Sequence, residues 1–132
     1  MRDILVPLSP GELLDKITIL RIKSARMSDA TKLANVRLEL QLLEQTWRDC
    51  GAAIPEVAAD EAELQRVNEA LWDIEDKIRD KELAGEFDAG FIELARAVYV
   101  TNDERAAVKK RVNLTLGSRI VEEKSYKPYR AS

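Results

Sequence analysis

The segment that decides the fold reads SPGELLDKITILRI over residues 9–22. It opens with the signature of a helix N-terminus: Ser9 stands at the N-cap, Pro10 at the first helical position, and Glu12 three residues after the cap. In such a capping box the serine side chain accepts a backbone N–H of the first turn, and proline fits because that N–H has no helical partner. We therefore expect a helix that is capped by Ser9 and extends to Met27.

The apolar residues of this first helix cover more than one of its faces. They are Leu13, Leu14, Ile17, Ile19, Leu20 and Ile22. A helix with such wide apolar coverage is packed on several sides. Asp15 falls among them on a helical wheel. A carboxylate there is either exposed at the margin, paired with a base on another helix, or a catalytic or metal-binding group with a perturbed pKa. We expect a structural role.

Two further helices carry apolar residues in alternating steps of three and four, the pattern of a coiled-coil-like seam. In the second helix, which Ser28 or Asp29 can cap and Gly51 ends, the seam consists of Leu33, Val36, Leu40, Leu43 and Trp47. In the third, from Asp60 to Gly85, it consists of Leu64, Val67, Leu71, Ile74 and Ile78. A loop over residues 52–59 joins them, so we expect these two helices to form an antiparallel hairpin.

A fourth helix is expected after Asp88, which can serve as its N-cap. Polar Thr101 and Arg105 interrupt its apolar seam between Val98 and Val112. The residues TNDE over 101–104 repeat a capping-box pattern, so the interruption is a kink, the start of a new helix, or a flaw within one long helix. We expect one long helix.

These elements predict an all-α fold: an antiparallel bundle of about four helices in a single domain over residues 1–132. Residues 1–8 form a short extended N-terminal arm and residues 118–132 a C-terminal tail, and their apolar pieces could pair as a two-stranded ribbon. The predicted core residues carry the seams; they are Leu40, Leu43, Val67, Leu71, Ile74, Val98 and Val112.

Composition excludes several classes of function. Charged residues make up 34% of the chain, but the net charge is only −3 and no strongly basic half is present to bind nucleic acid. No apolar run is long enough for a signal peptide or a membrane span, so we expect a cytoplasmic protein. Histidine is absent and Cys50 is the only cysteine, which excludes histidine-dependent nucleophiles and zinc sites built from thiolates or imidazoles. We expect neither a metal nor a cofactor.

The candidate site lies beside the apolar seams of the third and fourth helices. Its residues are Asn68, Trp72, Glu75 and Arg79 on the third helix and Tyr99, Asn102 and Lys109 on the fourth, with Asp15 of the first helix added. Two such flanks would line a cleft in which Arg79 and Lys109 could hold an anionic ligand. The alternative is that the charges pair with one another and serve packing, since Glu75 and Arg79 are an acid and a base one turn apart.

Two other charged stretches have simpler interpretations. A row of carboxylates on the outer face of the third helix is expected to be solvated rather than to bind a divalent cation; it consists of Glu69, Asp73, Asp76 and Asp80. The C-terminal residues 122–129 read EEKSYKPY and are either a docking strip with two tyrosines or a frayed tail. We favour docking.

Several blocks of sequence resemble one protein family across nearly the whole chain. They are Val6-Pro7 followed by GELLDKITIL at 11–20, KLANVR at 32–37, Asn68 with Leu71-Trp72 and Ile74-Glu75-Asp76, Tyr99 with NDER at 102–105, and Gly117-Ser118 with EEKSY at 122–126. The chain resembles an uncharacterised bacterial family, a domain of unknown function found in short all-helical proteins. The resemblance brings no reaction or ligand with it.

Two hypotheses about function follow. The first is an interaction module of a bacterial cytoplasm that forms a homo-oligomer, most simply a dimer, and presents the candidate site to a protein partner, because the first helix has more apolar faces than one hairpin can cover. The second is a small histidine-free enzyme or anion-binding protein, in which arginine and lysine act in a polar cleft, in a layout similar to that of the all-helical chorismate mutases. A metal-dependent nucleotide hydrolase is a third possibility, but most carboxylates face outward.

Overall fold

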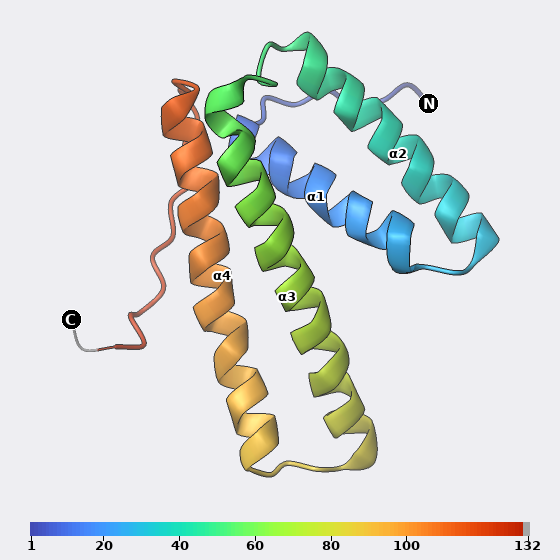
Figure 1. The fold of residues 1–132 in the computed structure, drawn as a ribbon, viewed down its shortest axis with the longest axis vertical. Coiled ribbons are helices and arrows are strands. Elements are labelled where there is room, and N and C mark those ends of the chain that lie inside the picture. The colour runs from blue at the N-terminus through green and yellow to red at the C-terminus, as the bar shows by residue number, and fades with distance from the viewer. Residues whose placement is uncertain (131–132) are drawn as a thin grey trace.

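The computed structural model describes residues 1–130, and four α-helices make up most of that range (Figure 1). They are α1 (Pro10–Arg26), α2 (Ala30–Asp49), α3 (Ala58–Ala84) and α4 (Ala89–Thr115), with a short 3-10 helix, η1 (Pro55–Val57), directly before α3. No strand occurs in the described range, so the predicted all-α class is confirmed. None of the described helices combines the length and apolar character needed to cross a membrane.

Side-chain caps start three of the helices. Ser9 Oγ accepts the Glu12 N–H at 3.2 Å, as predicted, and Asp29 and Asp88 accept in the same way at the starts of α2 and α4. Gly85, with a φ of 67°, ends α3 in the left-handed conformation that glycine adopts without strain.

The predicted start of α3 at Asp60 is wrong. The helix begins two residues earlier, at Ala58, and has no side-chain cap. The η1 turn continues directly into it and supplies the backbone acceptors, since Val57 N–H donates to the Ile54 carbonyl and Ala58 N–H to the Pro55 carbonyl. The Asp60 carboxylate instead accepts a hydrogen bond from Arg111 of α4.

Helix α4 is continuous from Ala89 to Thr115, which confirms the expectation of one long helix. The polar residues at Thr101 and Arg105 do not break it, because helix geometry depends on backbone hydrogen bonds that a polar side chain leaves intact. The interruption of its seam therefore marks a polar contact with another helix.

The hairpins differ from the predicted ones. α1 pairs with α2 and α3 with α4, and α1 also packs against both α3 and α4 (Figure 1). The predicted hairpin of the second and third helices is wrong, since no Cα atom of α2 lies within 8 Å of one in α3, and both helices are fully described. The reason is the wide apolar coverage of α1, which occupies the central position and takes α2 on one side and the α3–α4 hairpin on the other.

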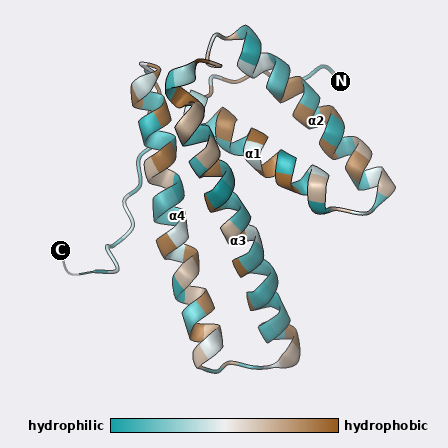
Figure 2. Ribbon diagram, in the orientation of Figure 1, coloured by the Kyte–Doolittle hydropathy of each residue, from teal (hydrophilic) through white to brown (hydrophobic). Residues whose placement is uncertain are grey.

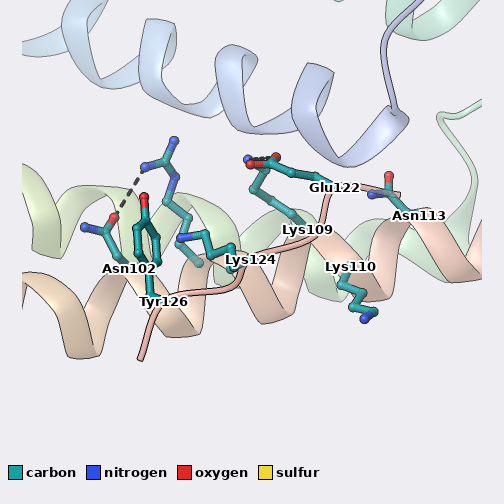
Figure 3. A pocket seen from close by; sticks show the side chains of 9 residues that line it. Asn102, Lys109, Lys110, Asn113, Glu122, Lys124 and Tyr126 are labelled. Carbon is teal, nitrogen blue, oxygen red and sulfur yellow. Dashed lines mark hydrogen bonds and ion pairs between the residues drawn. The ribbon is translucent and has the colours of Figure 1, made fainter. Parts of the chain in front are cut away.

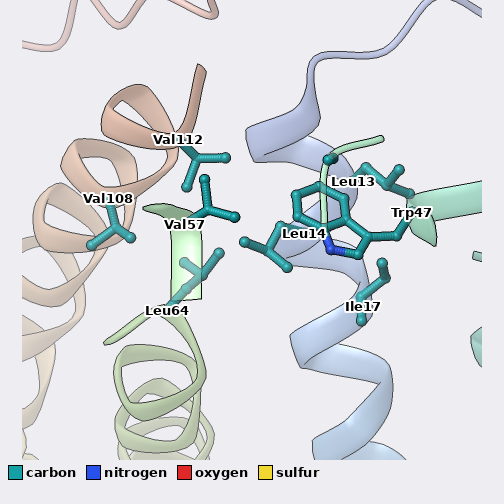
Figure 4. Packing of buried hydrophobic residues seen from close by; sticks show 9 residues of the cluster. Leu13, Leu14, Ile17, Trp47, Val57, Leu64, Val108 and Val112 are labelled. Atoms are coloured by element: carbon teal, nitrogen blue, oxygen red, sulfur yellow. The ribbon is translucent and has the colours of Figure 1, made fainter. Parts of the chain in front are cut away.

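The core is centred on α1 (Figure 4). Its buried residues are Leu13, Leu14, Ile17, Trp47, Ala52, Val57, Leu64, Val108 and Val112. In Figure 2, scattered hydrophobic residues interrupt a mainly hydrophilic α3.

Only part of the predicted core is fully buried. Val67 and Val112 are buried, whereas the other five predicted residues are half-buried; these are Leu40, Leu43, Leu71, Ile74 and Val98. The α3–α4 hairpin extends beyond α1 (Figure 1), so a contact between two helices covers the distal apolar side chains incompletely.

The terminal segments do not form the ribbon that we expected. Residues 1–9 and 118–130 contain no strand, and the apolar residues of the N-terminal arm are largely exposed. A two-stranded ribbon is marginal in water without a surface to cover it, and these two segments have no such surface in common.

We predict that Gly11→Ala lowers the free energy of unfolding by about 1–3 kcal/mol, the usual cost of overpacking. Gly11 lies where α1 approaches α4 most closely: a Cβ there would overlap the Lys109 carbonyl oxygen and lie 2.8 Å from Asn113 Oδ1. Urea denaturation provides the measurement. The matched control is Gly90→Ala, whose Cβ would approach the flexible side chains of Asp88 and Lys81 at 3.3 Å. If both substitutions have the same effect, the close approach at Gly11 is unimportant.

Candidate functional site

A buried carboxylate on α1 is the centre of the polar contacts between helices. Asp15 is 1% exposed and accepts two hydrogen bonds from Arg105 of α4, from Nε at 2.9 Å and from Nη2 at 2.5 Å. Asn68 Nδ2 of α3 donates a third, at 2.9 Å. A two-pronged guanidinium–carboxylate contact is among the strongest polar pairs in proteins, so Asp15 ties α1 to both helices of the α3–α4 hairpin.

The neighbours of Asp15 are fixed in turn. Asn68 Nδ2 also donates to Thr18 Oγ1 at 2.9 Å, and the Thr18 hydroxyl donates to the Asp15 backbone carbonyl at 2.8 Å. All three side chains are buried. Because their polar groups are paired, their burial does not carry the cost of unsatisfied donors and acceptors.

Lys109, one turn beyond Arg105 on α4, is surrounded by carboxylates. Its Nζ lies 2.6 Å from Glu12 Oε2, 3.2 Å from Glu122 Oε2 and 3.8 Å from Asp15 Oδ2. The lysine side chain is only 12% exposed. A single, largely enclosed ammonium group therefore joins α1, α4 and the segment that follows α4.

The pKa values of these groups follow from burial and pairing. Burial is the largest influence on the pKa of Asp15 and raises it, but hydrogen bonds from Arg105 and Asn68 and the charges of Arg105 and Lys109 together lower the pKa below its ordinary 3.8. The hydrogen bond to Asp15 raises the pKa of Arg105. Burial lowers the pKa of Lys109 most, yet its contacts with Glu12, Asp15 and Glu122 bring the pKa above the usual value. All three groups are thus charged at neutral pH.

A pocket of about 190 Å³ lies between α4 and the C-terminal segment, with Arg105 and Lys109 in its lining (Figure 3). We call it the anion pocket. It is lined by Asn102, Arg105, Ala106, Lys109, Lys110 and Asn113 of α4 and by Glu122, Lys124 and Tyr126. Figure 3 shows Tyr126 beside Asn102 and Glu122 beside Lys109.

A second, more open cavity of about 380 Å³ lies between α1, α3 and α4, and we call it the α3–α4 cleft. Its lining is Ile19, Asn68, Leu71, Trp72, Glu75, Asp76, Arg79, Asn102 and Arg105. Asn102 and Arg105 line both cavities. Arg105 therefore lies between the two cavities and is paired with Asp15 on its interior side.

The structure brings together most of the site residues predicted from the sequence, but not all of them. Five line the α3–α4 cleft: Asn68, Trp72, Glu75, Arg79 and Asn102. Asp15 lies buried beneath Arg105, paired with a base on another helix as expected.

Two predicted residues lie elsewhere. Lys109 lines the anion pocket and Tyr99 lies against Tyr129, with ring centroids 5.5 Å apart. Arg79 and Lys109 line different cavities, so the structure does not bring them together around one ligand. Arg79 instead forms an exposed pair with Glu75 at 3.6 Å.

Several residues of this region were not among the predicted site residues. Arg105, Glu12 and Glu122 contact Asp15 or Lys109, and Lys110, Asn113 and Lys124 line the anion pocket. In the sequence, Arg105 only interrupts the apolar seam of the fourth helix, and Glu12 is part of a capping box. One signal could have identified Arg105. Asp15 interrupts an apolar face of α1 and Arg105 interrupts one of α4, and two opposite charges on buried faces are expected to pair. Glu122 belongs to the segment 122–129 that was expected to dock, but nothing in the sequence indicates that its carboxylate reaches Lys109.

Comparison with known proteins identifies a family. The model described as "Family of unknown function (DUF6165)" matches residues 4–131, nearly the whole chain, so the chain belongs to that family. The predicted membership of a family of unknown function is thus confirmed. No curated protein and no solved structure matches the chain.

We predict that Asp15→Asn lowers the free energy of unfolding by about 3–5 kcal/mol, because it leaves the buried side of Arg105 without its counter-charge. Chemical denaturation measures the change. Glu75→Gln is the control: it removes a carboxylate from an exposed pair and should change stability by less than about 0.5 kcal/mol. Equal stability of wild type and Asp15→Asn would contradict the proposed importance of the pair.

The same substitution should flatten the acid limb of the stability curve. Since the folded-state pKa of Asp15 is depressed, its stabilisation is complete above the unfolded value near 3.8 and is lost as the pH falls through the interval down to the folded pKa. Wild type should therefore lose stability more steeply than Asp15→Asn below pH 3.8. Parallel acid limbs would show that other carboxylates account for the loss.

Proposed function

We propose that this member of the family of unknown function binds a small anionic ligand, a carboxylate or a phosphate, in the anion pocket. The observation that carries the proposal is the chemistry of the lining, in which most polar groups available to a ligand are hydrogen-bond donors. A ligand that only accepts hydrogen bonds is the complement of such a surface.

The two asparagines of the pocket have their oxygens engaged within the protein. Asn113 Oδ1 accepts the Gly11 N–H at 2.7 Å, and Asn102 Oδ1 accepts from Arg105 Nη1 at 3.4 Å. Their NH₂ groups therefore remain as donors for a ligand. Lys109, Lys110 and Lys124 add ammonium groups.

Arg105 is oriented before any ligand arrives. Of its five N–H groups, three are engaged, two with Asp15 and one with Asn102, and the other two make no hydrogen bond to a described residue. Because Asp15 and Asn102 already hold Arg105, an anion binding to its remaining N–H groups would not have to immobilise a free side chain. A bidentate guanidinium suits both carboxylate and phosphate oxygens.

The size and charge of the pocket narrow the ligand class. About 190 Å³ is below the roughly 300–1,000 Å³ of pockets that enclose drug-sized molecules. A compact anion fits better than a nucleotide. Four cationic residues and one carboxylate line the pocket, and Asp15 and Glu12 beneath it balance only two of the cations.

We predict that inorganic phosphate, sulfate or succinate raises the melting temperature in a saturable way at constant ionic strength, because a ligand of the folded state stabilises it. Lys124→Ala should weaken the binding, and Asn102→Asp should abolish it by placing a carboxylate beside Arg105 without unfolding the protein. Lys32→Ala, which removes an exposed lysine outside the pocket lining, is the matched control. A melting temperature that none of the three anions changes would refute the proposal.

A second candidate function, self-association, is favoured by a separate observation. The apolar residues Ile4, Leu5 and Val6 of the N-terminal arm are 79%, 92% and 64% exposed. On α2, Leu38 and Leu42 are also exposed, and they lie one turn apart on the same face. The wide apolar coverage of α1 does not require a dimer, since α2, α3 and α4 cover it within one chain. The exposed apolar residues of the arm and of α2, however, suit contact with a second copy.

We predict that light scattering on the wild-type chain at about 100 µM reports twice the 14.9 kDa of the monomer. Leu42→Lys should restore the monomer by placing a charge in the contact. Leu83→Lys, which alters an equally apolar but remote residue near the tip of the α3–α4 hairpin, should not. A mass of one chain at every concentration would exclude the dimer.

A further inference from the structure

The segment after α4 is attached to the anion pocket mainly by side chains. Residues 118–130 have no regular structure, and within the described chain no backbone–backbone hydrogen bond joins residues 119–130 to the helices. The contacts are Glu122 with Lys109 at 3.2 Å, Glu123 with Lys110 at 3.6 Å, and the ring contact of Tyr129 with Tyr99. Such a segment can leave without disturbing a helix.

Beside the pocket, carboxylates outnumber the cations that they contact, and the structure shows which carboxylate is the extra one. Two cations, Arg105 and Lys109, contact three carboxylates, those of Asp15, Glu12 and Glu122. Asp15 and Glu12 belong to α1, and they alone would balance the two cations. Glu122 is the third, its side chain is 54% exposed, and it comes from the irregular segment.

We infer that Glu122 is an intramolecular ligand of the anion pocket: its carboxylate occupies the place of an external anion, and binding of that anion displaces Glu122 and releases residues 119–130 from α4. This inference rests on the proposed function. It adds that the anion competes with a carboxylate already present in the chain, so that occupancy of the pocket controls the position of the C-terminal segment.

The exchange preserves the charge pairing of Lys109. When Glu122 leaves, Lys109 keeps Glu12 at 2.6 Å, and the incoming anion takes over the place of the second carboxylate. The Lys109 hydrogen bond also lowers the pKa of Glu122, so the displaced group is an ionised carboxylate. One anion thus replaces another, and no buried charge is left unpaired.

The test compares Glu122→Gln with Glu93→Gln in the 132-residue chain, using phosphate and succinate as separate probes in calorimetric titrations. Glu122→Gln should bind anions roughly threefold to fivefold more tightly than wild type, the factor expected for loss of one partly exposed ion pair. Glu93→Gln, which removes an exposed carboxylate of α4 outside the pocket lining, should bind as wild type does. Loss of the same competitor should raise both affinities by the same factor, so the probe with the lower Kd identifies the better anion.

The mobility of the backbone of residues 119–126, measured as NMR order parameters, gives a second readout. The order parameters should fall when an anion saturates the wild-type chain, and they should already be low in unliganded Glu122→Gln. If anions bind wild type and Glu122→Gln equally and the order parameters do not change, this inference is wrong and the proposed function stands. If no anion binds either protein, both are wrong.

Discussion

An ionised carboxylate in the interior, that of Asp15, is the constraint on which the rest of the structure depends. At 1% exposure it has lost nearly all contact with water, and an unpaired charge there would cost several kcal/mol. The guanidinium of Arg105 and the amide of Asn68 replace the water, so one residue of α1 sets how α3 and α4 lie against it. The apolar contacts around Leu14 and Leu64 supply the burial, and the polar contact selects the arrangement.

The same contacts explain why the surface above Arg105 is rich in donors. Helix α1 supplies acceptors to the pocket floor, the carboxylates of Asp15 and Glu12, and one donor, the Gly11 N–H, which takes up the oxygen of Asn113. The absence of a side chain at Gly11 lets α1 come close enough for this. The character of the pocket is therefore a consequence of how two helices pack, and the irregular segment after α4 completes it with an acceptor of its own, Glu122.

Much of the fold could be predicted because it depends on neighbours in the sequence. The caps at Ser9, Asp29 and Asp88 and the end of α3 at Gly85 involve residues at most a turn or two apart. The pairing of helices could not be predicted in this way. The apolar seams of the second and third helices have the same pattern, but a seam indicates only that a helix face is buried, not which helix covers it. In the structure α2 packs against α1, and α3 packs against α4 and α1.

The candidate site divides along the same line. The sequence by itself determined which side chains flank the core along α3 and α4, since helical geometry alone places Asn68, Trp72, Glu75 and Arg79 on one flank, and five of the predicted residues do line one cleft. Only the tertiary structure decided that Arg105 is the residue between the two cavities, that Lys109 lies in the other one, and that Glu122 reaches it. Asp15 and Arg105 are 90 positions apart. The pairing of such distant charges follows from the packing of whole helices, and no local pattern records it.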